Sequence, residues 1–317
     1  MLIWWVLTEF QEAKSIKKKA KTLLFRKDFR ANCKKERYKL RELNHLSEVF
    51  NAYDTFVIDL WGVIHNGLHL NEKAIKVVDE LKKNSKKIVF LSNAPRPSAK
   101  VVDFLLKMKM DKKYLANVMT SGEAAMSAIN QNKFGKKFFH LGPPRDSSIY
   151  KKVKDCKTNI DDCDFILCTG LFDEDNNDTN KPQLHENDLN YYKNFLTKHI
   201  SKKLVCTNPD LTVHRGSNEE YCAGYIAKIF EELGGEVIYY GKPHEEIYHM
   251  CFNLDEKVLA IGDNLRTDIK GANNLNIDCV FISEGVHRNE YNDFSELESL
   301  LKKYKVKANF FQNELKW

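Results

Sequence analysis

Residues 55–63 read Thr-Phe-Val-Ile-Asp-Leu-Trp-Gly-Val, a short apolar run that ends in a carboxylate. A run of this kind is typical of a strand that is buried on both faces of a parallel sheet. In an open α/β sheet, ligands bind at the carboxyl ends of the strands, where Asp59 would lie. The stretch therefore predicts a parallel sheet with a polar site at Asp59, although an Asp in this position could also simply cap the turn.

The same alternation of short apolar runs with helical segments repeats along the chain after residue 46. Strands are predicted at 55–59, 87–91, 116–120, 236–240, 257–261 and 278–282, with helices near 71–83, 97–110, 121–132, 243–253, 266–275 and 293–303. A second set of strands, at 137–141, 164–168 and 203–206, has helices near 187–200 and 219–233. We therefore expect an α/β fold: a doubly wound, Rossmann-like parallel-sheet core over residues 47–135 and 237–317, with an α/β cap domain inserted at 136–236.

The composition of the chain is that of a globular protein. Its 317 residues are 43% apolar and 30% charged, and they contain no apolar run near the roughly 20 residues that a membrane-spanning helix needs. The apolar stretch Met1 to Leu7 precedes the lysines instead of following them, unlike a secretory signal. The eight cysteines form no C-x-x-C pair, so we expect reduced thiols and a cytoplasmic protein.

The net charge of +6 is concentrated in the first part of the chain. Residues 1–46 hold 13 Lys or Arg against 5 Asp or Glu, whereas the other 271 residues hold 37 against 39. A basic segment of this kind could contact nucleic acid or an anionic lipid surface. We expect instead a solvated N-terminal extension without a strand, because terminal segments are usually of that kind.

A second acidic motif follows the predicted strand at 257–261 and reads Gly262-Asp263-Asn264-Leu265-Arg266-Thr267-Asp268. Mg²⁺ binds oxygen ligands and usually takes one or two carboxylates. Asp263 suits a direct ligand of Mg²⁺, whereas Asp268, at the start of a helix, suits an outer-shell role or a helix cap. Asp59 could then accept a phosphoryl group covalently, provided that a cation neutralises the phosphate.

Two further polar residues stand at predicted strand ends. Ser92 precedes a Pro-rich helix start, so its hydroxyl and the following N–H groups could hold phosphate oxygens. Lys242 also precedes a proline, and from there its ammonium could neutralise Asp59 and a transferred phosphate. Either residue alone could be a cap or a solvated charge, but four polar sites at four strand ends indicate one shared site.

These motifs resemble those of the haloacid dehalogenase superfamily of aspartate-nucleophile phosphatases, from about Leu46 to the C-terminus. The acidic motif 262–268 resembles that of the class IIA, NagD-type branch, whose type 2 cap is inserted between the Ser92 and Lys242 motifs. Residues 207–210, Thr-Asn-Pro-Asp, and residues 222–224, Cys-Ala-Gly, resemble the cap region of that branch. Asn208 and Asp210 could therefore face the substrate, although Asn-Pro-Asp is equally a common turn.

The resemblance implies a role for each matching residue. Asp59 would be the nucleophile and a Mg²⁺ ligand, with the backbone carbonyl of Trp61 and the carboxylate of Asp263 as further ligands. Phosphoryl binding would involve Ser92, Asn93, Lys242 and Asn264.

The chain departs from the usual phosphatase pattern two residues after the nucleophile. That pattern has an Asp there as general acid and base, whereas this chain has Trp61, and an indole cannot transfer a proton. A class IIA subfamily with Asp-Leu-Trp-Gly-Val and Ser-Asn-Ala-Pro-Arg motifs shares this feature. His65 could replace the missing acid because imidazole titrates near neutrality, or it could simply pack in the loop.

The sequence thus favours a Mg²⁺-dependent phosphatase that acts through an aspartyl-phosphate on a small phosphorylated metabolite, such as a nucleotide, sugar or cofactor phosphate. One alternative is a catalytically impaired protein that only binds a phosphorylated ligand, and another is a different chemistry, such as carbon–halogen cleavage. We expect neither a nucleic acid nor a membrane as partner, and two copies of the chain could associate through the cap.

Overall fold

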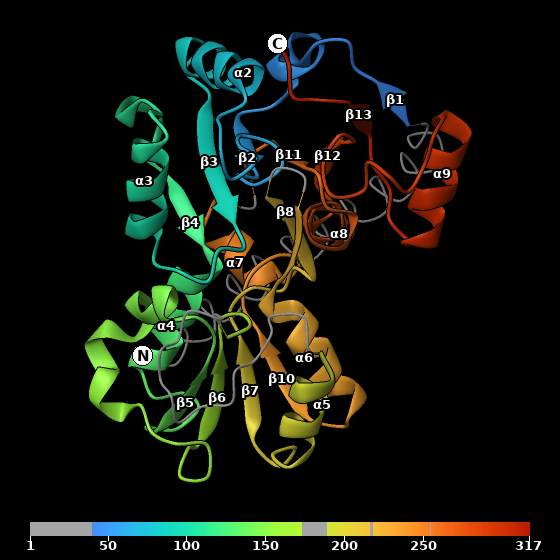
Figure 1. Cartoon of the computed structure of the whole chain (residues 1–317). Coiled ribbons are helices and arrows are strands. Elements are labelled where there is room, and N and C mark those ends of the chain that lie inside the picture. The colour runs from blue at the N-terminus through green and yellow to red at the C-terminus, as the bar shows by residue number, and fades with distance from the viewer. Residues whose placement is uncertain (1–39, 173–188, 216–217, 254) are drawn as a thin grey trace, which may run out of the picture. The chain divides into compact units, whose positions relative to one another are not determined.

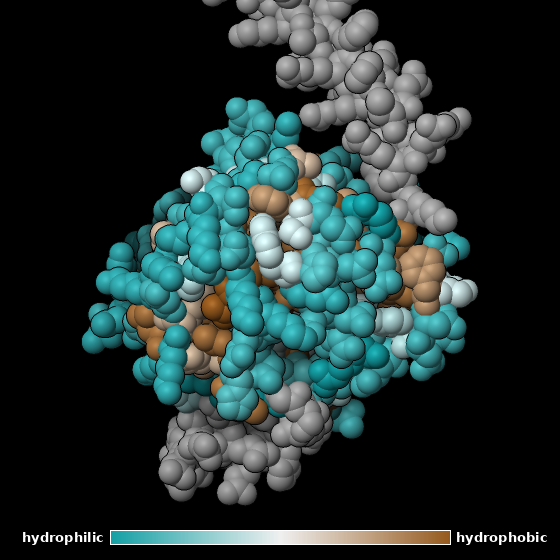
Figure 2. Space-filling model, turned by 90° about the horizontal axis from the view of Figure 1, so that it is seen from above, coloured by the Kyte–Doolittle hydropathy of each residue, from teal (hydrophilic) through white to brown (hydrophobic). Residues whose placement is uncertain are grey.

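The computed structural model describes residues 40–172, 189–215, 218–253 and 255–317. Most of the predicted N-terminal extension, residues 1–39, lies outside the described residues, as does the start of the helix predicted near 187. None of the described helices has the length and apolar character needed to cross a membrane. Hydrophilic side chains cover most of the face shown in Figure 2, as expected where apolar side chains fill a core.

The larger sheet has seven parallel strands in the order β1-β13-β12-β11-β2-β3-β4 (Figure 1). Its strands are β1 (Arg41–Glu42), β2 (Thr55–Ile58), β3 (Lys87–Ser92), β4 (Val118–Thr120), β11 (Val258–Gly262), β12 (Asp278–Ile282) and β13 (Phe310–Gln312). The five strands predicted within 55–120 and 257–282 are therefore confirmed. Asp59 directly follows β2, which lies between β11 and β3.

Helices cover both faces of this sheet because successive strand residues point to opposite sides. Phe56 and Ile58 pack with α2 (Glu72–Lys83) and α3 (Ser98–Lys107). Val57, between them, packs with α7 (Glu245–His249). The remaining helices of this part are α8 (Lys270–Leu275), which follows a π-helical turn η5 (Leu265–Ile269), and α9 (Phe294–Lys303). The predicted doubly wound α/β fold is confirmed.

The expectation that residues 1–46 lack a strand is wrong at its C-terminal end. β1 pairs with β13, so segments from opposite ends of the chain lie side by side, in blue and red in Figure 1. Leu43 and Leu46 are buried in the main core. Two residues are too few to show an alternating pattern, so β1 is identified only by its pairing with β13.

The smaller sheet has four parallel strands in the order β10-β7-β6-β5. They are β5 (Phe138–Leu141), β6 (Phe165–Cys168), β7 (Lys203–Cys206) and β10 (Glu236–Tyr239). One face packs against α5 (Leu189–Thr197) and α6 (Ala223–Glu232). The other face packs against α4 (Ser121–Asn130) and the kinked segment η4 (Pro144–Cys156).

Two predicted boundaries of the cap need correction. β10 belongs to the smaller sheet, where it pairs with β7, whereas we expected it in the main sheet. Ala125 and Ile129 of α4, a helix assigned to the core, pack against the smaller sheet. The helix predicted near 219–233 begins only at Ala223, because β8 (Thr212–Arg215) and β9 (Asn218–Tyr221) form an antiparallel hairpin before it. Local patterns identify strands and helices, but not the sheet that they join.

Candidate active site

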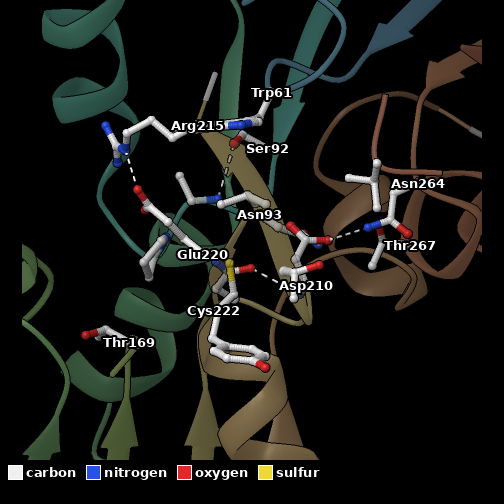
Figure 3. A pocket seen from close by; sticks show the side chains of 18 of the residues that line it. Trp61, Ser92, Asn93, Thr169, Asp210, Arg215, Glu220, Cys222, Asn264 and Thr267 are labelled. Carbon is white, nitrogen blue, oxygen red and sulfur yellow. Dashed lines mark hydrogen bonds and ion pairs between the residues drawn. The ribbon is translucent and has the colours of Figure 1, made fainter. Parts of the chain in front are cut away.

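A pocket of about 380 Å³ opens where the carboxyl ends of β2, β3 and β11 meet the hairpin β8–β9 (Figure 3). It is lined by ten of the eleven residues that the sequence singled out: Asp59, Trp61, Ser92, Asn93, Asn208, Asp210, Lys242, Asp263, Asn264 and Asp268. Since these residues come from five separate segments, the fold brings together what the sequence disperses.

Lys242 connects two of the acidic motifs. Its buried ammonium donates hydrogen bonds to Asp59 Oδ1, to Asp268 Oδ1 at 2.7 Å and to the carbonyl of Leu91 at 3.0 Å. Burial lowers the pKa of Lys242, but the carboxylates of Asp268 and Asp59 outweigh burial and raise the pKa above its ordinary value. The side chain is therefore a fixed positive charge beside Asp59.

Three buried carboxylates form a cluster with the chemistry of a metal site. Oxygen atoms of Asp59, Asp263 and Asp268 lie within 4.8 Å of one another. Burial raises the pKa of Asp59 and of Asp263, and neighbouring carboxylates raise both further, whereas Lys242 lowers both. The ammonium of Lys242 offsets only part of the negative charge of the three carboxylates. A divalent cation would offset the rest, and carboxylate oxygens are the ligands that Mg²⁺ prefers, so these residues fit it.

Backbone contacts hold the Asp263 carboxylate in place. The N–H of Val286 donates to its Oδ2 at 2.9 Å. Gly62 has a positive φ of +88°, and a Cβ there would lie only 2.1 Å from the same oxygen. The loop after β2 therefore requires glycine at this position in order to approach Asp263.

The loops that carry Ser92 and Lys242 are hydrogen-bonded to each other through Asn93. The Asn93 side chain accepts from the N–H of Lys242 at 2.8 Å and donates to the Lys242 carbonyl at 3.1 Å. Ser92 Oγ accepts from the N–H of Ala94 at 3.2 Å, and both Ser92 and Asn93 are buried. These contacts hold a hydroxyl and backbone N–H groups beside Asp59.

Asp268 binds a backbone N–H of the acidic loop and the ammonium of Lys242. Its Oδ2 accepts from the N–H of Asn264 at 3.1 Å, while its other oxygen accepts from Lys242. Asn264 caps the following turn, where its Oδ1 accepts from the N–H of Arg266 at 3.0 Å. The cap residue Asp210 reaches this loop: its Oδ1 accepts from Asn264 Nδ2 at 3.3 Å and from Asn93 Nδ2 at 3.2 Å.

Trp61 contacts the cap hairpin. Its indole N–H donates to the carbonyl of His214 at 2.8 Å, and the guanidinium of Arg215 lies 5.3 Å from the center of its ring. On the core side the ring packs against Gly67, where a Cβ would lie 2.6 Å from a ring carbon.

His65 is not among the residues that line the pocket. Its ring is buried between Trp61 and Phe104, with ring centers 5.1 and 5.5 Å apart, and its Nδ1 accepts from the N–H of Gly67 at 3.1 Å. Burial, with a smaller contribution from Arg215, lowers the pKa of His65 to about 4. A neutral imidazole in this place supports the Trp61 loop, so the structure does not support His65 as a substitute acid.

Sequence reasoning missed two ion pairs that line the pocket. Arg215 pairs with Glu220 at 2.8 Å across the hairpin, and Arg96 pairs with the buried Asp146 (Figure 3 shows the first pair). Arg96 stands in the Ser-Asn-Ala-Pro-Arg motif, which gave a signal for it. Glu220 falls where we predicted the start of a helix and Arg215 lies just before it, so only the hairpin places the two side chains together.

Two family models match the chain. The model described as haloacid dehalogenase-like hydrolase matches residues 56–154, and the one described as HAD-hydrolase-like matches residues 239–304. Together these ranges include the loops after β2, β3, β10 and β11. No curated protein matches the chain.

Solved structures share the fold over most of the chain. A haloacid dehalogenase-like hydrolase from Brucella suis is 27% identical, with a TM-score of 0.72 over 87% of this chain and 100% of that chain. A possible sugar phosphatase from Cytophaga hutchinsonii is 19% identical, with a TM-score of 0.67 over 86% and 98%. A 4-nitrophenylphosphatase from Thermotoga maritima is 22% identical, with a TM-score of 0.61 over 84% and 96%.

Proposed function

Because the chain belongs to the haloacid dehalogenase superfamily of hydrolases, we propose that it is a Mg²⁺-dependent phosphatase that forms an aspartyl-phosphate at Asp59. The observation that carries the proposal is the contact of Lys242 with both Asp59 and Asp268, within a cluster of buried carboxylates. An ammonium in this position would favour an ionised Asp59 and an incoming phosphate at the same time.

In this proposal the pocket residues around Asp59 have defined roles. Asp59 attacks phosphorus, while Ser92, the N–H of Asn93 and Lys242 hold the phosphoryl oxygens. Mg²⁺ would be held by Asp59, Asp263 and the backbone carbonyl of Trp61, with Asp268 in the outer shell. When bound, the cation neutralises the phosphate and lowers the repulsion between the phosphate and the nucleophile.

The size and lining of the pocket support a class of substrate. About 380 Å³ suits a small metabolite, and the hairpin β8–β9 forms one wall, which restricts entry by larger molecules. Beyond the phosphate groups, the ion pairs Arg215–Glu220 and Arg96–Asp146 offer donors and acceptors for hydroxyls. We therefore propose a nucleotide, sugar or cofactor phosphate, a class that includes the sugar phosphates named for one structure of this fold.

The test is a screen of purified protein against phosphorylated metabolites and p-nitrophenyl phosphate, with release of inorganic phosphate as the readout. We expect turnover that requires Mg²⁺ and is lost in Asp59→Asn. Asp278→Asn is the matched control, because Asp278 binds Tyr53 and Asn309 at the amino end of β12, away from the pocket.

The rival function is a protein that binds phosphorylated ligands without turnover, as Trp61 in place of an acid suggests. Phosphate binding by folded protein that hydrolyses no ester in the screen would favour this rival and contradict the phosphatase. The likeness to phosphatase structures supports turnover instead.

A further inference from the structure

A phosphatase that uses Asp59 needs a group to protonate the leaving oxygen, and position 61 cannot supply it. The indole N–H of Trp61 is already bonded to the His214 carbonyl. His65 is buried beneath the Trp61 ring, outside the pocket. The acid must therefore come from another residue that lines the pocket.

Most carboxylates of the described pocket are committed to other partners. Asp59 and Asp268 bind Lys242, Asp263 accepts from Val286, Asp146 pairs with Arg96, and Glu220 pairs with Arg215. Glu219 is exposed at the rim. Asp210 differs from all of these because the hydrogen bonds to its side chain come from the neutral amides of Asn93 and Asn264. It can gain or lose a proton without breaking an ion pair.

The position of Asp210 is also suitable. Figure 3 shows its carboxyl group between Asn93, beside the phosphate-binding Ser92, and Asn264 of the acidic loop. Asp210 follows β7 and precedes β8, so it enters the pocket from the cap side. A phosphate bound in line with Asp59 directs its leaving group away from Asp59, toward the cap.

We propose that Asp210 is the general acid and base of this enzyme and takes over the role that Trp61 cannot fill. The inference rests on the proposed phosphatase function. Asn208 and Pro209 would then place the carboxyl group as part of the Thr-Asn-Pro-Asp turn, where Asn208 Oδ1 accepts from the N–H of Asp210 at 3.1 Å.

The electrostatic surroundings agree with this role. Burial raises the pKa of Asp210 above its ordinary value, Lys242 lowers it, and Asp268 raises it. A carboxyl group with a raised pKa holds its proton at higher pH than usual, as a general acid must. The titratable groups nearby are Lys242, Asp59, Asp268 and the thiols of Cys206 and Cys222.

The proton moves once in each direction during turnover. As a carboxylate oxygen of Asp59 bonds to phosphorus, the bond from phosphorus to the ester oxygen breaks, and that oxygen takes its electron pair and the Asp210 proton to leave as an alcohol. Water then attacks the aspartyl-phosphate and gives a proton to the Asp210 carboxylate. The bond from phosphorus to Asp59 breaks, its electron pair returns to Asp59, and inorganic phosphate is released.

The experiment compares leaving groups in the wild type, Asp210→Asn and the control Asp278→Asn. An asparagine can still accept from Asn93 and Asn264, so the cap contact is kept. We expect Asp210→Asn to lower kcat/KM, which reports transfer of the phosphoryl group to Asp59, by about 100-fold or more for an alkyl phosphate and by less than about 10-fold for p-nitrophenyl phosphate, because nitrophenolate leaves without a proton. With that ester, slow hydrolysis of the aspartyl-phosphate should also give a burst of about one nitrophenol per enzyme in Asp210→Asn.

Equal losses for both esters, with no burst, would overturn the role of Asp210 and leave the phosphatase proposal intact. If the wild-type protein hydrolyses neither ester, the phosphatase proposal itself is overturned. If Asp210→Asn does not fold, a series of aryl phosphates with the wild type decides: a general acid predicts rates nearly independent of leaving-group pKa, and a steep dependence contradicts it.

Discussion

The indole N–H of Trp61 donates a hydrogen bond of 2.8 Å to the carbonyl of His214, which joins the loop after the nucleophile strand to the cap hairpin. Arg215, the next residue along the hairpin, stacks on the same ring. The side chain two positions after Asp59 therefore binds the cap, and the cap in turn carries Asp210 into the pocket.

Trp61→Phe should weaken this connection while keeping a ring for Arg215. A lost hydrogen bond costs about 1 kcal/mol, which corresponds to a KM increase of about fivefold if the hairpin must be closed to bind substrate. Trp317→Phe is the matched control, because Trp317 packs against Phe50 in the main core. Steady-state kinetics check the prediction, and an unchanged KM in Trp61→Phe would contradict it.

The double variant Trp61→Asp with Asp210→Asn tests whether the acid can move between the two positions. We expect it to recover part of the turnover of alkyl phosphates that Asp210→Asn loses, since a carboxylate then follows the nucleophile by two residues. The reference is Trp61→Asp alone, which measures the cost of losing the cap contact. Thermal unfolding should be measured alongside the kinetics to compare the stability of the variants. A double variant no faster than Asp210→Asn would show that a carboxylate at position 61 does not replace Asp210.

Removing one carboxylate of the cluster should separate metal binding from stability. In the absence of a divalent cation, Asp263→Asn should be as stable as the wild type or more so, because repulsion with Asp59 and Asp268 is relieved. Millimolar Mg²⁺ should raise the melting temperature of the wild type but not that of Asp263→Asn or Asp59→Asn. Calorimetric titration gives the affinities, and full Mg²⁺ affinity in both variants would refute the metal assignment.

Two N-terminal deletions should differ sharply. Deletion of residues 1–39 should leave the melting temperature nearly unchanged, since the described strand and core residues begin at Leu40. Deletion of residues 1–46 removes β1 and the buried Leu43 and Leu46. At about 1.5–3 kcal/mol for each buried leucine, the second deletion should cost several kcal/mol. Equal unfolding free energies for the two proteins in urea would contradict the role of β1.

Stability should fall in mild acid because His287 is buried as a neutral ring. Its Nε2 accepts from the N–H of Leu265 at 3.1 Å, and its Nδ1 contacts Glu290 at 2.6 Å. Burial lowers the pKa of His287, and the adjacent Glu290 raises it, while Arg266 and Lys303 lower it. In mild acid the unfolded chain, in which a histidine has a pKa near 6.5, therefore binds a proton at His287 more readily than the folded protein does.

The stabilisation by neutral His287 is complete above a pH of about 6.5 and is lost as the pH falls toward the pKa of His287 in the folded protein. This group changes the free energy of unfolding by at most about 1.4 kcal/mol per pH unit. Urea unfolding between pH 7.5 and 5.5 should show a shallower slope for His287→Asn than for the wild type. Identical slopes would exclude His287 as a contributor.

Much of the site could be predicted because its residues follow recognisable strands. Asp59, Ser92 and Asp263 each end an apolar run, and the carboxyl ends of parallel strands share one edge of a sheet. His65 was included in the site only because it follows Trp61 by four residues, and this spacing does not reveal that its ring lies beneath the ring of Trp61.

The sequence by itself determined the α/β alternation, the parallel sheet and the polar strand ends, because these depend on local periodicity and on which residues tolerate burial. Only the tertiary structure decided that β10 joins the smaller sheet, that β1 pairs with β13, and that Asp210 meets Asn93, 117 positions away. Such contacts depend on which apolar surfaces pack together across the whole chain, and a short window of neighbouring residues does not determine that packing.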